Sequence, residues 1–128
     1  MKPAESTPVK IRAIIAGSRE VTDYRVVEVA VRESGWADDI AVVVSGGARG
    51  VDRLGERWAD GHLRPVALFL PDYDRHERHF APIARNREMA KSADLLIAIW
   101  DGESRGTKNM IFEARDVGIP VHVHRVTL

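Results

Sequence analysis

The chain has 128 residues, enough for one domain that buries roughly two-thirds of its unfolded surface. Its 19 Lys and Arg residues balance its 19 Asp and Glu residues, so no excess charge draws it to nucleic acid or to an acidic membrane. The absence of cysteine excludes disulfides and thiolate metal sites, and no apolar run is long enough to cross a bilayer. We therefore expect a cytoplasmic protein without a signal peptide or a membrane partner.

Strands and helices alternate along the sequence. Residues 1–9 are polar and contain two prolines, which predicts a disordered tail before a single domain over residues 10–128. Apolar, often β-branched runs predict strands at 11–16, 40–44, 65–70, 95–100 and 120–124. Apolar residues at helical spacing predict helices at 23–34, 51–60, 82–92 and 107–117, with Ile83 and Val117 on inner faces and Gly35, Gly61 and Gly118 as terminators.

This alternation predicts an α/β fold, a Rossmann-like doubly wound three-layer sandwich built on a five-stranded parallel sheet. The simplest strand order is 3-2-1-4-5, in which the first and fourth strands are neighbours. Ligands of such sheets bind beyond the carboxyl ends of the strands, where the strand order reverses. The turns after the first, second and fourth strands all carry small or polar residues and open at this point, which predicts a binding crevice.

The stretch VVVSGGARGVD, residues 42–52, follows the pattern of a buried strand, a glycine turn and a helix start. Unpaired amide groups and the positive end of a helix dipole make such a turn attractive to anions. Arg49 adds a guanidinium suited to phosphate, and Asp52 either accepts a hydrogen bond from a sugar hydroxyl or only stabilises the helix dipole. The alternative is a tight connection that needs glycine for steric reasons alone.

Two common nucleotide motifs are missing. The turn after the first strand reads GSRE instead of G-x-G-x-x-G, and no acidic residue ends the second strand to hold a ribose. No Walker lysine motif is present either. The sequence therefore argues against an NAD dehydrogenase and against a P-loop NTPase.

Four motifs in this order resemble the SLOG superfamily: GSR at 17–19, SGGARGVD at 45–52, RNREM at 85–89 and SRGT at 104–107. That superfamily unites the DNA-processing protein DprA with the LOG phosphoribohydrolases, and the chain is most similar to its small, single-domain YspA-like branch over residues 11–124. The resemblance implies a Rossmann-like domain that binds or senses a nucleotide or a nucleotide-derived phosphorylated small molecule. The turns and the resemblance together predict these ligand-binding residues: Gly17, Ser18, Arg19, Ser45, Gly46, Gly47, Arg49, Gly50, Asp52, Arg85, Asn86, Ser104, Gly106 and Thr107.

Three functional classes compete, and we expect the first of them, ligand binding without catalysis and without a cofactor. The second is a LOG-like phosphoribohydrolase that cleaves nucleoside monophosphates. The LOG motif P-G-G-x-G-T-x-x-E places a carboxylate three residues after its threonine, but this chain has Met110 there, and Glu113 should face elsewhere. The third is DprA-like binding of single-stranded DNA, which the zero net charge argues against. Assembly into homo-oligomers stays open.

Four further features have alternative interpretations. Trp100 either stacks on a base or covers the core, and Thr107 either cradles phosphate or caps a helix. The histidine pairs His76/His79 and His122/His124 are interpreted as surface or strand residues, so no metal site is expected. The charged segment 71–81 is too long for an ordinary connection and is predicted to be a movable flap over the crevice, a surface loop or an extra helical turn before the helix at 82–92.

Overall fold

The computed structural model describes residues 10–128, so the predicted tail lies outside the described residues. The elements follow in the order β1 (Ile11–Gly17), α1 (Tyr24–Ser34), the short 3₁₀ helix η1 (Ala37–Asp39), β2 (Ile40–Ser45), α2 (Val51–Gly61), β3 (Val66–Leu68), α3 (Ala81–Ser92), β4 (Leu95–Trp100), α4 (Arg105–Val117) and β5 (Val121–Arg125). All strand pairs are parallel, and the sheet order β3-β2-β1-β4-β5 confirms the predicted fold class.

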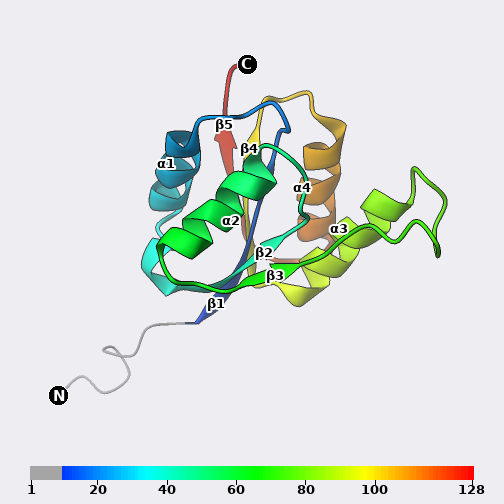
Figure 1. Ribbon diagram of the computed structural model, residues 1–128, viewed down its shortest axis with the longest axis horizontal. Helices are drawn as coiled ribbons and strands as arrows, with labels where there is room; N and C mark the ends of the chain where they lie inside the picture. The colour runs from blue at the N-terminus through cyan, green and yellow to red at the C-terminus, as the bar shows by residue number, and fades with distance from the viewer. Residues whose placement is uncertain (1–9) are drawn as a thin grey trace.

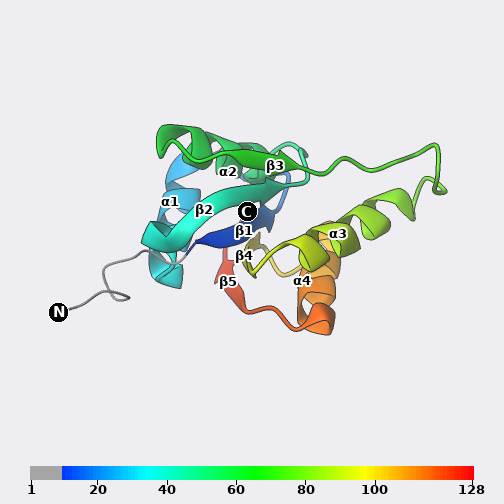
Figure 2. The same ribbon diagram turned by 90° about the horizontal axis from the view of Figure 1, so that it is seen from below.

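The sheet separates two apolar cores because alternate residues of its central strands point to opposite faces. On one face, Ile15 of β1 and Val43 of β2 pack with buried residues of α1 and α2. On the other face, Ile14 and Val44 pack with buried residues of α3 and α4. Figures 1 and 2 show the resulting three layers, with α1 and α2 on one side of the sheet and α3 and α4 on the other.

Three helix ends follow the chemistry expected of them. Asp23 caps α1, and its side chain accepts a hydrogen bond from the amide of Arg25. Gly35 and Gly118 end α1 and α4 in the left-handed conformation, with φ of 79° and 95°. None of the helices within residues 10–128 is long and apolar enough to span a membrane.

Several boundary predictions were wrong in detail. Gly61 is the last residue of α2 and does not terminate it in a left-handed turn; Leu63 adopts the positive φ instead, at 56°. β3 is shorter than predicted, and α4 begins at Arg105. Ile83 and Val117 are 39% and 40% exposed, so neither belongs to the core; Ile83 lies in the first turn of α3 and Val117 is the last residue of α4, and fewer neighbours cover a helix end.

Candidate functional site

A cavity of about 440 Å³ opens at the carboxyl ends of β1 and β4, at the predicted switch point. This volume lies within the range of small-molecule sites, roughly 300–1,000 Å³. Nine predicted residues line it: Gly17, Ser18, Arg19, Asp52, Arg85, Asn86, Ser104, Gly106 and Thr107. The residues that the sequence analysis missed are chiefly three carboxylates from the turns, Glu20, Asp101 and Glu103, and the apolar floor formed by Met89 and Met110.

Arg49 does not line this cavity, contrary to expectation. Its side chain is 72% exposed, and its guanidinium forms an ion pair with Glu20 at 3.0 Å. Arg49 instead reaches the turn after β1, where its partner Glu20 lines the cavity. The positive charge at the cavity comes instead from Arg19 and Arg85.

The three glycines of the turn after β2 do not line the cavity: Gly46, Gly47 and Gly50. Ser45 supports this turn from below. Its hydroxyl donates to Glu56 Oε2 at 2.7 Å and accepts from the amide of Gly47 at 3.2 Å. These four residues therefore shape the site without facing it.

Arg85 is held by backbone carbonyls that follow β2 and β3, those of Gly46 and Phe69, and by the side chain of Asn86, with Nη1 3.4 Å from the carbonyl of Phe69. Its Nη1 donates to the carbonyl of Gly46 at 2.7 Å, and its Nε donates to Asn86 Oδ1 at 2.9 Å. Burial lowers the pKa of this guanidinium, and the nearby carboxylate of Asp52 opposes that change. The side chain is thus pre-positioned, with part of its fork turned toward the cavity.

Asp52 lies in the first turn of α2 and is only 6% exposed. Burial raises the pKa of its carboxyl to about 6, although a hydrogen bond from the amide of Ala48 at 3.1 Å and the charge of Arg85 oppose the shift. A buried carboxyl with a raised pKa is a recurring mark of functional sites.

Gly46 is required where Arg85 and Asp52 meet. A Cβ at position 46 would lie 2.7 Å from Arg85 Nη1 and 2.9 Å from Asp52 Oδ2. A side chain at this position would displace the guanidinium or the carboxylate, so the glycine allows the two groups to converge. The steric interpretation of this glycine and the binding interpretation of the turn are therefore compatible.

The turn between β4 and α4 is held rigidly. Asp101 accepts hydrogen bonds from the amides of Ser104 and Glu103, which lower the pKa of its carboxyl. The indole of Trp100 donates to the carbonyl of Ser104 at 3.1 Å and packs against the core. Trp100 therefore holds this turn against the core. Thr107 lies inside the first turn of α4 and is not its N-cap; that position belongs to Ser104.

The start of α4 leaves amide donors free for a ligand. Ser104 makes no capping hydrogen bond through its side chain; its hydroxyl lies 3.2 Å from the hydroxyl of Thr107. The amides of the first turn therefore lack side-chain acceptors within the described chain, and Gly106 and Thr107 line the cavity. This combination suits an anion.

A polar network between α3 and α4 orients Asn86. Asn86 Nδ2 donates to Asn109 Oδ1 at 2.9 Å, and Asn109 Nδ2 lies 3.4 Å from Glu113 Oε2. Glu113 is 2% exposed, and its other oxygen accepts from Arg87 Nε at 3.1 Å. Glu113 therefore faces α3 and not the cavity, as predicted, but its burial was not foreseen.

This network should be sensitive to loss of its cation. In Arg87→Ala, Glu113 stays buried without its charge partner, so we expect a free energy of unfolding lower by about 1–3 kcal/mol. Glu113→Gln should be milder, because a neutral amide needs no countercharge and still bonds Asn109. Urea unfolding of both variants at pH 7 measures the difference. Equal stability of Arg87→Ala and the wild-type protein would show that the buried carboxylate does not depend on Arg87.

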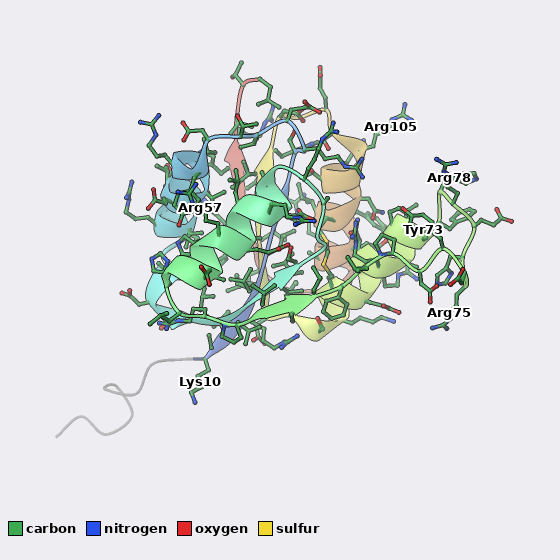
Figure 3. All side chains as sticks on the ribbon, viewed as in Figure 1. Lys10, Arg57, Tyr73, Arg75, Arg78 and Arg105 are labelled. Atoms are coloured by element: carbon green, nitrogen blue, oxygen red, sulfur yellow. The ribbon has the colours of Figure 1, made fainter. Side chains whose placement is uncertain are left out.

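The segment 71–81 does not cover the cavity, since none of its residues lines it. It projects beyond α3 in both ribbon views (Figures 1 and 2), and Figure 3 shows Tyr73, Arg75 and Arg78 on it. It contributes Asp72, Arg75, His76 and Ala81 to a smaller cavity of about 160 Å³ on another side of Arg85. In this conformation the segment is a projecting surface loop, and its movement over the crevice on ligand binding stays a prediction.

The histidines do not form a metal centre within the described residues, where no group of three or more suitable ligands is found. His124 Nδ1 lies 2.8 Å from Glu33 Oε2, and His122 lies 3.8 Å from the same oxygen. These contacts join β5 to α1 at the opposite border of the sheet from β3. They have no connection to the cavity.

Comparisons with known proteins agree with this architecture. The chain is similar to the Gene 61 protein of Mycobacterium phage D29, with 36% identity over 117 residues, 86% of this chain and 93% of the phage protein. Its fold is similar to the X-ray structure of DNA processing protein A (DprA) from Streptococcus pneumoniae, with a TM-score of 0.67 at 18% identity. That match covers 94% of this chain but only 51% of the DprA chain, so the protein spans about half the length of that structure. Residues 11–76 match the model of the YspA, cpYpsA-related SLOG family, and the chain belongs to that family.

Proposed function

We propose that this protein binds a nucleotide or a nucleotide-derived phosphorylated small molecule in the cavity between the turns after β1 and β4, and that it does so without catalysis. The observation that carries the proposal is the convergence of free amides at the start of α4, the guanidinium of Arg85 and the buried carboxyl of Asp52 on one space. Amides and guanidinium suit phosphate, while the carboxyl suits a sugar hydroxyl. A binding or sensing role follows from this pairing.

The direct test is native mass spectrometry of the purified protein for a retained nucleotide, followed by calorimetry with a panel of nucleoside mono-, di- and triphosphates. At least one member of the panel should bind and raise the melting temperature, because a ligand that binds only the folded state stabilises it. No heat and no thermal shift across the panel would contradict the proposal.

A phosphoribohydrolase is the second candidate, favoured by the SLOG family and by the placement of Arg85 and Thr107 beside the same cavity. The weakness of this candidate is position 110, where the LOG motif has a carboxylate. Here Met110 is 2% exposed and adds an apolar surface to the cavity. The nearest carboxylate further along α4 is Glu113, which pairs with Arg87 instead. The α4 wall of the cavity therefore lacks the carboxylate of the LOG motif, and the carboxylates that do line the cavity, Asp52, Glu20, Asp101 and Glu103, come from other segments.

We accordingly expect no release of base from nucleoside monophosphates above the uncatalysed background. Chromatography of long incubations with the four common ribonucleoside monophosphates measures it, and Arg85→Ala is the control for contaminating hydrolases. Turnover that disappears in Arg85→Ala would establish the enzyme instead. Binding of single-stranded DNA, suggested by the SGGARGVD turn and by the similarity in fold to DprA, is not favoured by the zero net charge.

A further inference from the structure

Exposed apolar side chains concentrate in one part of the fold. Of the ten large apolar residues exposed within residues 10–128, seven lie between positions 63 and 83, around β3 and the loop that follows it. Val66, Leu68 and Leu70 are 38%, 53% and 63% exposed, and Tyr73 and Phe80 on the projecting loop are exposed as well. Concentrated apolar surface of this kind marks an interaction site. We call Val66, Leu68, Leu70 and the loop 71–80 the edge patch.

The backbone at the edge patch is open too. Within residues 10–128, β3 is an edge strand whose one pairing partner is β2. The carbonyl of Pro65 and the amide of Phe69 bond β2, so by the two-residue repeat the peptide groups of Val66 and Leu68 point outward. Ala67 and Phe69 pack into the α3/α4 core, whereas the exposed Val66 and Leu68 lie on the opposite face, in register with Val43 and Ser45.

Proteins ordinarily protect such an edge with a charged residue, a bulge or a covering element. No charged side chain occurs from Val66 to Leu70, the run VALFL. The nearby helix α2 does not cover this edge either, since Val66, Leu68 and Leu70 are all exposed. The edge therefore combines free peptide groups with uncovered leucines, which is the composition of an association surface.

We propose that the edge patch is the interface between two copies of this chain, with the two β3 strands pairing antiparallel across a two-fold axis. Such an interface must be complementary to itself. The charges meet this requirement, because the loop carries three acidic residues, Asp72, Asp74 and Glu77, beside two arginines, Arg75 and Arg78. The chain as a whole has zero net charge, so its copies do not repel each other.

The size of the interface also requires the loop. A stable dimer buries about 800 Å² on each partner, more than a strand of three residues supplies. The loop projects from the body in both ribbon views (Figures 1 and 2), where it can reach across a neighbouring copy. Pairing through β3 and wrapping by the loop together form one continuous surface, and two sheets of five strands become one of ten.

Sedimentation of the full chain across a range of concentrations tests the assembly, and a concentration-dependent dimer is expected. Leu68→Asp/Leu70→Asp should raise its dissociation constant at least about tenfold, since each change places an unpaired charge in an apolar contact. Both positions are more than half exposed, so the variant monomer should fold, and circular dichroism checks this. Phe112→Asp is the matched control, because Phe112 is 59% exposed on α4, outside the patch, and its dimer should be unchanged.

A second measurement uses the absence of cysteine from the chain. Leu68→Cys places a single thiol at the proposed two-fold contact, so mild oxidation should yield a covalent dimer, whereas Phe112→Cys should yield far less. A monomer at every concentration would overturn the proposal. A dimer that survives Leu68→Asp/Leu70→Asp unchanged would overturn it equally, because the copies would then meet through another surface.

Discussion

Arg85→Ala should weaken binding of the nucleotide identified in the panel by about ten- to a hundredfold, the largest effect we expect of any cavity substitution on affinity. A charge-assisted hydrogen bond to phosphate contributes about 1.5–3 kcal/mol, which corresponds to that range. The guanidinium of Arg85 is already held by Gly46 and Asn86, so a ligand does not have to order a flexible side chain. Titration calorimetry at constant salt measures the change.

Arg49→Ala is the matched control for this experiment. It removes the same charge from a neighbouring turn, but Arg49 is exposed, bound to Glu20 and outside the cavity, so affinity should change by less than about threefold. Arg85→Lys adds a third comparison, because lysine keeps the charge and loses the planar fork. Equal losses in Arg49→Ala and Arg85→Ala would show that general attraction to positive charge, and not the cavity, governs binding.

The fold could be predicted from the sequence because its signals are local and redundant. The central strands are apolar on both faces, the helices carry apolar stripes, and Gly35 and Gly118 end two helices. The strand order follows from connection rules that leave few alternatives. The β3 edge of the sheet was harder to predict. β3 ends at Leu68, and the conformation of the loop 71–80 depends on contacts that no short sequence pattern encodes.

The sequence predicts which turns form the site, but it does not predict which of their side chains enter the cavity. Sequence places Arg49 and Arg85 equally near the crevice, but whether an arginine enters it depends on where its partner lies. Glu20, distant from Arg49 in sequence, pairs with that side chain at the exposed surface, while the carbonyl of Gly46 holds Arg85 at the cavity. The burial of Glu113 was missed for a similar reason: its cation, Arg87, comes from another helix.

Stability should depend on pH through Asp52. Its pKa is about 6 in the folded protein, against an ordinary value near 3.9 for an unfolded chain. Between these values the folded state holds the proton more tightly, so this group favours folding at low pH and its contribution is lost as the pH rises through 6. A shift of about two units corresponds to about 3 kcal/mol as an upper value.

Asp52→Asn should remove this slope. The amide keeps the shape of the side chain and no longer buries a charge, so the variant should be more stable than the wild-type protein at pH 8, by up to about 3 kcal/mol. Urea unfolding between pH 4.5 and 8 measures the slope for both proteins. Asp101→Asn is the control: hydrogen bonds to its turn lower the pKa of Asp101, so its carboxylate stays ionised throughout and the slope should persist.

The same variant separates stability from binding. If Asp52 accepts a hydrogen bond from a sugar hydroxyl, Asp52→Asn should bind the nucleotide about tenfold or more weakly while it unfolds at higher urea concentration. Opposite changes of this kind arise when a buried charge is kept for its ligand at the expense of the folded state. A variant that gains stability and binds as well as the wild-type protein would exclude Asp52 from ligand recognition and leave Arg85 and the α4 amides as the binding groups.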